Sequence, residues 1–256
     1  MKPQYARRSP VGGACYGPPV KISVVIPALD EADQIDAAIG NARKDACQAA
    51  ATGDSGSPHE IEIIVVDGGS EDTTVERAEA AHAHVLATGR GRARQLGEGA
   101  RASHGSVLLF LHADTRLPRG WADAIAAALE DPNVVGGAFG FRFDRRDSWA
   151  LRLVEGGARL RARWLGLPYG DQALFVRRAT LEALGGIPQT PIMEDLDLVQ
   201  AMKRYGRLAL LPLDAVTSSR RHRAGGVLRT AVRHALAAFA WGLGADRERI
   251  AAWVRR

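Results

Sequence analysis

The chain has 256 residues, of which 46% are hydrophobic and 25% charged; these ordinary values exclude a chain disordered throughout and suit one globular α/β domain with additions. Its net charge of +5 comes mostly from arginine, which suits phosphate binding, but an excess of Arg over Lys also follows from the base composition of coding DNA. With 6% aromatic residues, the chain offers few stacking positions between its cations, which argues against nucleic-acid binding.

The distribution of cysteines and apolar residues bears on location. Cys15 and Cys47 lack metal-ligand spacing, which is simplest for a reduced protein. No apolar run approaches the roughly 18 residues of a membrane span, and the N-terminus lacks the apolar centre of a signal peptide. We therefore expect a cytoplasmic protein, with peripheral contact to the inner face of the membrane left open.

The first half of the chain alternates predicted strands and helices. Residues 1–20 are rich in Gly, Pro and Arg and are predicted to form a flexible leader. Strands are predicted over 21–27, 61–66, 84–86 and 107–111, helices over about 30–51, 72–82 and 94–103, and a loop over 52–58. This alternation favours a doubly wound parallel sheet, whose ligands bind beyond the carboxyl ends of the strands.

The second half is less regular. Strand is predicted within 134–143 and 208–216, and helices over 121–129, 149–164, 179–184, 196–205, 227–240 and 247–255. The apolar stripe from Val227 to Phe239 is expected to pack on the core, whereas the Arg-rich residues 149–166 are left open as an acceptor-side or membrane-facing surface. The predicted division is a leader (1–20), a main domain (21–225) and a helical extension packed on it (226–256).

Polar residues follow three predicted strands. Asp30 could cap the first helix and Asp67 could stabilise a turn, but both also stand where a ligand would bind. His112 and Asp114 are two residues apart, so along a strand their side chains point the same way. One could hold a nucleotide and the other a divalent cation; the alternative is a polar strand end followed by a turn.

A second acidic group, Glu194, Asp195 and Asp197, precedes a predicted helix. Carboxylates are favoured at a helix N-terminus by the helix dipole, which is the structural interpretation. The functional interpretation is a carboxylate that removes a proton from an acceptor hydroxyl.

Taken in order, these motifs resemble those of the family 2 glycosyltransferases, over about residues 21–225. The matching segments are SVVIPALDE (23–31), VVDGGSEDTT (65–74), FLHADT (110–115), GDQALFVRR (170–178) and MEDLD (193–197). Within that family, GRARQ (91–95) before a strand ending in LHADT is similar to the transferase 2 subgroup associated with radical-SAM and selenium-domain genes.

The resemblance implies a GT-A fold, a Rossmann-like mixed sheet flanked by helices, with helices at the C-terminus. It also implies an inverting transfer of a sugar from a nucleotide-diphosphate donor, usually UDP-linked, to an unknown acceptor, with Mg²⁺ or Mn²⁺ as cofactor. Asp195 would be the general base with Glu194 beside it, and Asp114 would bind the metal. The implied nucleotide-binding residues are Pro27, Leu29, Glu31, Asp67, Gly69, Arg92, Gln95, His112, Ala113 and Asp114, and those of the sugar and acceptor pocket are Gly170, Asp171 and Gln172.

The chain departs from the family pattern at three positions. His112 stands where many members have the first Asp of an Asp-any-Asp motif, Asp30 where Asn is frequent, and Gly97 where Asn often occurs. The first departure weakens the expected metal site without removing it, because Asp114 and the diphosphate still supply oxygen ligands.

The late segment SSRRH (218–222) adds three candidates. Arg220 and Arg221 are predicted to contact the diphosphate. His222 is either a late metal ligand or a solvated residue of an Arg-rich loop.

Two other functions compete with glycosyl transfer. A sugar-1-phosphate nucleotidyltransferase would carry a Gly-rich basic loop after the first strand, where this chain has PALDE (27–31). A non-catalytic nucleotide-sugar-binding protein would keep the nucleotide pocket without the base.

Overall fold

The computed structural model describes residues 19–44 and 59–255. The predicted leader (apart from residues 19 and 20), the end of the first predicted helix and the loop at 52–58 lie outside the described residues.

Four parallel strands form one half of an eight-stranded sheet. β1 (Lys21–Ala28) lies between β2 (Glu60–Asp67) and β4 (Val107–Phe110), and β3 (His84–Ala87) pairs with β2. β1, β4 and the second half of β2 are buried on both faces, as expected inside a parallel sheet, whereas β3 at the edge of the sheet is partly exposed. The strands predicted in this half are confirmed.

The other half of the sheet mixes antiparallel and parallel pairs, so the doubly wound parallel sheet that the first half favoured does not extend across it. β7 (Leu174–Arg177) pairs antiparallel with β4: its first residue, Leu174, lies opposite Phe110, the last residue of β4. The full order is β3-β2-β1-β4-β7-β6-β8-β5, in which the remaining strands are β6 (Val134–Phe143), β8 (Arg207–Thr217) and β5 (Thr115–Arg116). The sheet is therefore mixed, as the GT-A resemblance implied.

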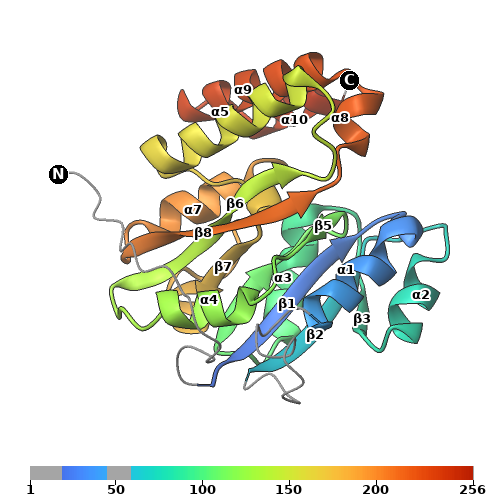
Figure 1. Ribbon diagram of the computed structural model, residues 1–256, viewed down its shortest axis with the longest axis vertical. Coiled ribbons are helices and arrows are strands. Elements are labelled where there is room, and N and C mark those ends of the chain that lie inside the picture. The colour runs from blue at the N-terminus through green and yellow to red at the C-terminus, as the bar shows by residue number, and fades with distance from the viewer. Residues whose placement is uncertain (1–18, 45–58, 256) are drawn as a thin grey trace.

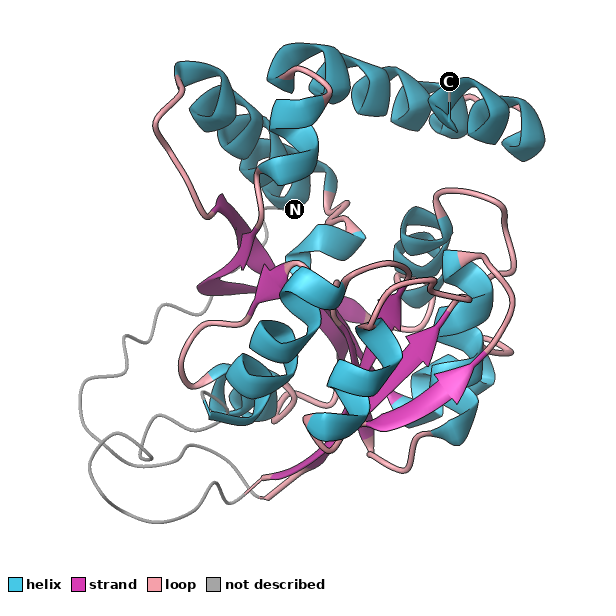
Figure 2. Ribbon diagram, turned by 90° about the vertical axis from the view of Figure 1, so that its right-hand side faces the viewer, coloured by secondary structure: helices cyan, strands magenta, loops and turns pink. Residues whose placement is uncertain are grey.

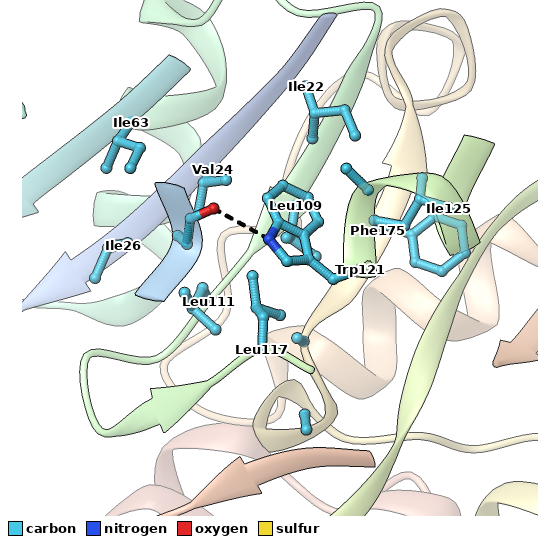
Figure 3. Close-up of a cluster of buried hydrophobic side chains, with 14 of the residues drawn as sticks. Ile22, Val24, Ile26, Ile63, Leu109, Leu111, Leu117, Trp121, Ile125 and Phe175 are labelled. Atoms are coloured by element: carbon cyan, nitrogen blue, oxygen red, sulfur yellow. Dashed lines mark hydrogen bonds between the residues drawn. The ribbon is translucent and has the colours of Figure 1, made fainter. Parts of the chain in front are cut away.

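Helices cover both faces of the sheet. On one face, Val24 of β1 belongs to the same buried cluster as Trp121 and Ile39. The indole N–H of Trp121 donates to the carbonyl oxygen of Ala42 at 3.1 Å (Figure 3). On the other face, Leu96 and Val25 belong to a second cluster. The first face is covered by α1 (Ala32–Lys44), α2 (Thr74–Ala80) and α4 (Trp121–Ala128), and the second by α3 (Arg92–Ala102), α6 (Arg178–Ala183) and α7 (Glu194–Met202).

A further layer of helices lies beyond one end of the sheet, at the top of Figure 1. It consists of α5 (Trp149–Leu165), α8 (Arg220–Ala224), α9 (Val227–Gly242) and α10 (Arg247–Arg255). The helices predicted at 149–164, 227–240 and 247–255 are confirmed, whereas α8 was not predicted. The proposed domain boundary at residues 225 and 226 falls between α8 and α9 and stays a prediction. Within the described ranges, no helix is both long and apolar enough to cross a membrane.

The prediction that the apolar stripe of α9 packs on the core was largely wrong. Val232, Leu236 and Phe239 are exposed, whereas the buried side of the helix carries Ala237 and Trp241. Ala237 and Trp241 pack against α7 and α10, so the helix is held by its less apolar side. The spacing predicts an amphipathic helix correctly but does not say which side meets the protein.

Two glycine substitutions test the packing of the sheet. A Cβ at Gly137 of β6 would clash with the carbonyl oxygen of Ala209 and lie 2.7 Å from the ring of Phe175. We expect Gly137→Ala to lower the free energy of unfolding by about 1–3 kcal/mol, because backbone and ring must move. Gly40→Ala in α1 meets nothing within 4 Å and should raise it by about 0.5–1 kcal/mol. Urea unfolding checks both; equal stability of the two variants would contradict the packing.

Candidate functional site

The carboxyl ends of β2, β1 and β4 meet at one edge of the sheet. Ala28 lies opposite Asp67 in the register of β1 and β2, and β4 is the other neighbour of β1. The segments that follow these strands carry Asp30, Asp67 and Asp114, so the edge collects the polar residues that the strand pattern predicts there.

Asp67 stabilises its own turn. Its Oδ2 accepts hydrogen bonds from the backbone N–H of Gly69 at 2.8 Å and of Ser70 at 3.0 Å. Gly69 has a φ of 92°, which a side chain would strain. The turn interpretation of Asp67 is therefore correct, and a nucleotide contact would have to share these oxygens.

Asp30 does not cap α1, contrary to the capping interpretation. It has a φ of 53°, and its Oδ1 accepts from the N–H of Glu71 at 2.9 Å. Asp72 Oδ2 accepts from Ala32 N–H at the start of α1 instead, at 3.1 Å. The loops after β1 and β2 are thus tied to each other.

Glu31 joins this edge to the late Arg-rich segment. Its buried carboxylate forms an ion pair with Arg220, with Nη2 and Oε2 3.1 Å apart, and Asp33 lies 3.8 Å from the other Nη of Arg220. Pro27 is half-buried within β1 and Leu29 is exposed just after it. The side chain of Arg221 lies outside the described residues.

Gln95 connects the ends of two strands. Its Nε2 donates to the carbonyl oxygens of Ala28 and Val66, each at 2.8 Å, and the side chain is buried. The residue is therefore structural at this edge. Arg92, one turn earlier in α3, lies with Nε 3.6 Å from Oε1 of Glu194.

Asp195 and His112 meet at Gly170. The N–H of Gly170 donates to Asp195 Oδ2 at 2.7 Å, and a Cβ at Gly170 would lie 3.0 Å from His112 Nε2. The absence of a side chain therefore lets both groups approach the same point. They line a narrow cavity of about 10 Å³, together with Arg92, Leu96, Phe110, Gly170, Leu174, Ile187, Glu194 and Leu198.

Glu194, which lines this cavity, is buried, and Asp171, next to Gly170, is half-buried with its Oδ1 enclosed. Oδ1 of Asp171 has no hydrogen-bond partner among the described residues, and burial raises the pKa of Asp171 to about 6. The negative charges of Asp195 and Asp114 act in the same direction. Burial also raises the pKa of Glu194, against the attraction of Arg92.

His222 lies near Asp114. Burial lowers the pKa of His222, while the charge of Asp114 opposes that change, and the imidazole packs edge-on against Phe143 with ring centres 4.9 Å apart. His222 is thus not simply solvated. Across residues 19–44 and 59–255, no group of three or more His, Cys, Asp and Glu side chains is arranged to hold a metal ion.

Other predicted residues have structural contacts. Gln172 is fully buried, donates to Phe139 O at 2.9 Å and accepts from Tyr169 N–H at 3.2 Å, and Ala113 is buried in the core. Asp197, third of the acidic group, accepts from the indole N–H of Trp241 at 2.7 Å. Asp197 is therefore structural, but through contacts with Trp241 and Arg247 rather than through the helix dipole alone.

Sequence reasoning missed three residues around the site. The guanidinium of Arg161 in α5 stacks on the ring of Tyr169, 3.3 Å from its centre, beside Gly170 and Asp171. Tyr169 directly precedes the GDQ motif, which is the signal that could have identified it. Trp241 could not be found from the pattern, because it is 44 residues from Asp197.

The raised pKa of Asp171 predicts a pH-dependent stability. Its folded pKa, about 6, lies above the ordinary 3.8, so folding favours the neutral acid, and this stability is lost as pH rises from about 4 to 6. We expect Asp171→Asn to raise the free energy of unfolding at pH 7.5, by at most about 3 kcal/mol, with a smaller change at pH 3.5. Urea unfolding at both values measures this.

A matched control is Asp131→Asn. A backbone hydrogen bond from Asn133 holds the pKa of Asp131 below its ordinary value, so this substitution should lower stability at pH 7.5. An Asp171→Asn protein that is less stable than the parent at pH 7.5 would refute the raised pKa of Asp171.

Comparison with known proteins gives this geometry its context. The sequence model described as "Glycosyl transferase family 2" matches residues 23–184, more than half of the chain. No curated protein sequence matches the chain.

Three solved structures share the fold. A mannosyltransferase from Pyrobaculum calidifontis in complex with GDP-Man and Mn²⁺ has a TM-score of 0.63 at 18% identity, over 96% of this chain and 72% of that one. Glucosyl-3-phosphoglycerate synthase from Mycobacterium tuberculosis, in complex with Mn²⁺, UDP and glucosyl-3-phosphoglycerate, has 0.60 at 20%, over 89% and 81%. Mannosyl-3-phosphoglycerate synthase from Rubrobacter xylanophilus has 0.56 at 19%, over 89% and 76%. The chain has the GT-A fold and belongs to glycosyl transferase family 2.

Proposed function

We propose that this chain transfers a sugar from a nucleotide-diphosphate sugar to an acceptor nucleophile, with inversion, and that Asp195 is the general base. The observation that carries the proposal is the meeting of Asp195 and His112 at Gly170, next to the strand edge that bears Asp114. Membership of the family supports the class of reaction, and the geometry supports the assignment of the base.

Asp195 is suited to accept a proton because its orientation is fixed. Its two carboxylate oxygens accept from the N–H groups of Gly170 at 2.7 Å and Leu196 at 2.8 Å. Each carboxylate oxygen has a second lone pair, which can accept the proton of an acceptor hydroxyl. As that oxygen bonds to the anomeric carbon, the bond to the diphosphate breaks and the diphosphate leaves with its electron pair. A single displacement of this kind inverts the anomeric centre.

The donor side would use the residues of the strand edge. Asp114 and His222 would hold a divalent cation together with diphosphate oxygens, and this mixed oxygen and nitrogen set fits Mn²⁺ better than Mg²⁺. When bound, the cation would stabilise the charge of the departing diphosphate. Arg220, at the same edge, would contact the diphosphate, as would Arg221 by its sequence position.

The finer assignments remain proposals. Similar structures are described with UDP or with GDP-Man, and we propose a UDP-linked donor for this chain. The remaining nucleotide-site residues, Pro27, Leu29, Glu31, Gly69 and Ala113, are proposed from the motif positions alone. The transferase 2 subgroup and a cytoplasmic location also stay predictions, and neither gives the acceptor.

The test separates donor binding from chemistry. Isothermal titration with UDP, UDP-Glc and GDP-Man, each with and without Mn²⁺, is expected to show metal-dependent binding. Asp114→Ala should weaken it at least about tenfold. Asp195→Asn should leave binding within about threefold and lower the slow release of UDP from UDP-Glc, with water as acceptor, by about 10²–10⁴-fold. Asp36→Asn, an exposed carboxylate on α1, is the control and should change neither.

Three results would overturn these roles. They are equal binding with and without metal in the parent protein, full UDP release by Asp195→Asn, and pyrophosphate release from UTP with a sugar 1-phosphate. The last would favour a nucleotidyltransferase. Donor binding without any release of UDP would instead favour the non-catalytic nucleotide-sugar-binding protein.

A further inference from the structure

The outer helical layer presents apolar side chains to solvent on two helices. On α9 the exposed residues recur every three or four positions, which places them on one side of the helix. They are Leu228, Val232, Leu236, Phe239 and Leu243, of which Leu243 is 72% exposed. Soluble proteins rarely expose a continuous apolar stripe of this kind unless it contacts a partner or a membrane.

The same arrangement occurs on α5. Trp149, Leu153, Leu160 and Trp164 follow helical spacing, Leu165 adjoins them, and Trp164 is 76% exposed. Between Leu153 and Leu160 the positions of the stripe are occupied by Gly156 and Gly157, so no polar side chain interrupts it. The opposite side of α5, with Leu151 and Ala158, packs on Phe141 and Phe143.

These two helices lie in one layer. α5 contacts α9, and both lie in the layer outside the sheet in the two views (Figures 1 and 2). We call the exposed side chains of the two stripes the outer face. No segment within residues 19–44 and 59–255 covers the outer face, because its side chains are exposed when all of these residues are present.

The outer face lies in the most basic part of the chain. Residues 145–165 and 220–256 contain fifteen of the 34 cationic residues and four of the 29 acidic ones, a net charge of +11. The rest of the chain has a net charge of −6. Exposed arginines stand within the stripes themselves: Arg152 and Arg163 on α5, and Arg229 on α9.

We propose that the outer face binds the surface of an anionic lipid bilayer. Its apolar side chains would enter the boundary between headgroups and acyl chains, while the arginines contact lipid phosphates. Trp149 and Trp164, at the two ends of α5, are the residue type enriched at membrane interfaces. A helix that lies flat in the interface can be shorter than a membrane span, and α5 and α9 have 17 and 16 residues.

A second copy of the chain is the competing occupant, and charge disfavours it. Pairing two outer faces would bring together two layers whose chain segments each carry a net charge of +11, whereas an anionic bilayer supplies the opposite charge. The proposal does not depend on glycosyl transfer, because the outer face contains none of the residues assigned to the site.

Co-sedimentation of the full chain with vesicles tests the proposal. We expect binding to vesicles of phosphatidylcholine with phosphatidylglycerol at low salt, a large loss of binding at 0.5 M NaCl, and little binding to phosphatidylcholine alone. The triple substitution Leu236→Gln, Phe239→Gln, Leu243→Gln should lower the partition coefficient at least about tenfold. Arg229→Glu should lower it about fivefold or more.

Two exposed residues outside the layer serve as matched controls. Tyr205→Gln removes an exposed aromatic side chain and Arg204→Glu reverses an exposed charge, both after α7, and neither should change vesicle binding by more than about twofold. Thermal unfolding of each variant checks that the fold is kept.

Failure of the parent protein to bind anionic vesicles, or unchanged binding by the triple variant, would overturn the proposal. Sedimentation equilibrium provides the remaining arm: a parent dimer that the triple variant dissociates, without vesicle binding, would assign the outer face to a second copy of the chain.

Discussion

The parallel pairing of β1 with β2 and β4 is the constraint on which the site depends. Because the three strands run the same way, their carboxyl ends lie at one edge, and the loops that follow them are forced together. Gln95 strengthens this alignment by donating at once to the carbonyl of Ala28, the last residue of β1, and to that of Val66, one residue before the end of β2. A polar side chain in a helix thus fixes the relative position of two strand ends.

The second half of the site comes from chain segments around an antiparallel strand. β7 runs antiparallel to β4, so the turn before it, with Gly170 and Asp171, lies beside the end of β4 and its His112. α7 then brings Asp195 to the same point from a later part of the chain. The acids gathered here are costly to bury, and Arg92 and Arg161 offset part of the repulsion between them.

How far the sequence predicts this structure differs between its parts. Runs such as Ile61–Val66 identify strands because β-branched residues buried on both faces leave few alternatives. The direction of β7 could not be predicted, because pairing partners far apart in sequence are set by the path of the intervening chain. For the site, spacing identifies the residues, but not that Asp67 and Gln95 would satisfy local backbone groups. For α9, the helical spacing was predicted correctly but the buried side was not. The buried contacts are made by Ala237 and Trp241, which lie outside the most apolar side of the helix.

The ion pair between Glu31 and Arg220 has a kinetic consequence. It joins residues 189 positions apart, and one of its partners is the arginine proposed for the diphosphate. A ligand phosphate that binds Arg220 must displace the carboxylate of Glu31. The net gain in binding free energy is therefore the energy of the new ion pair minus that of the old one. The same exchange favours departure, because Glu31 reoccupies Arg220 as the ligand leaves. The pair would therefore limit affinity for the donor while shortening the residence time of the diphosphate product.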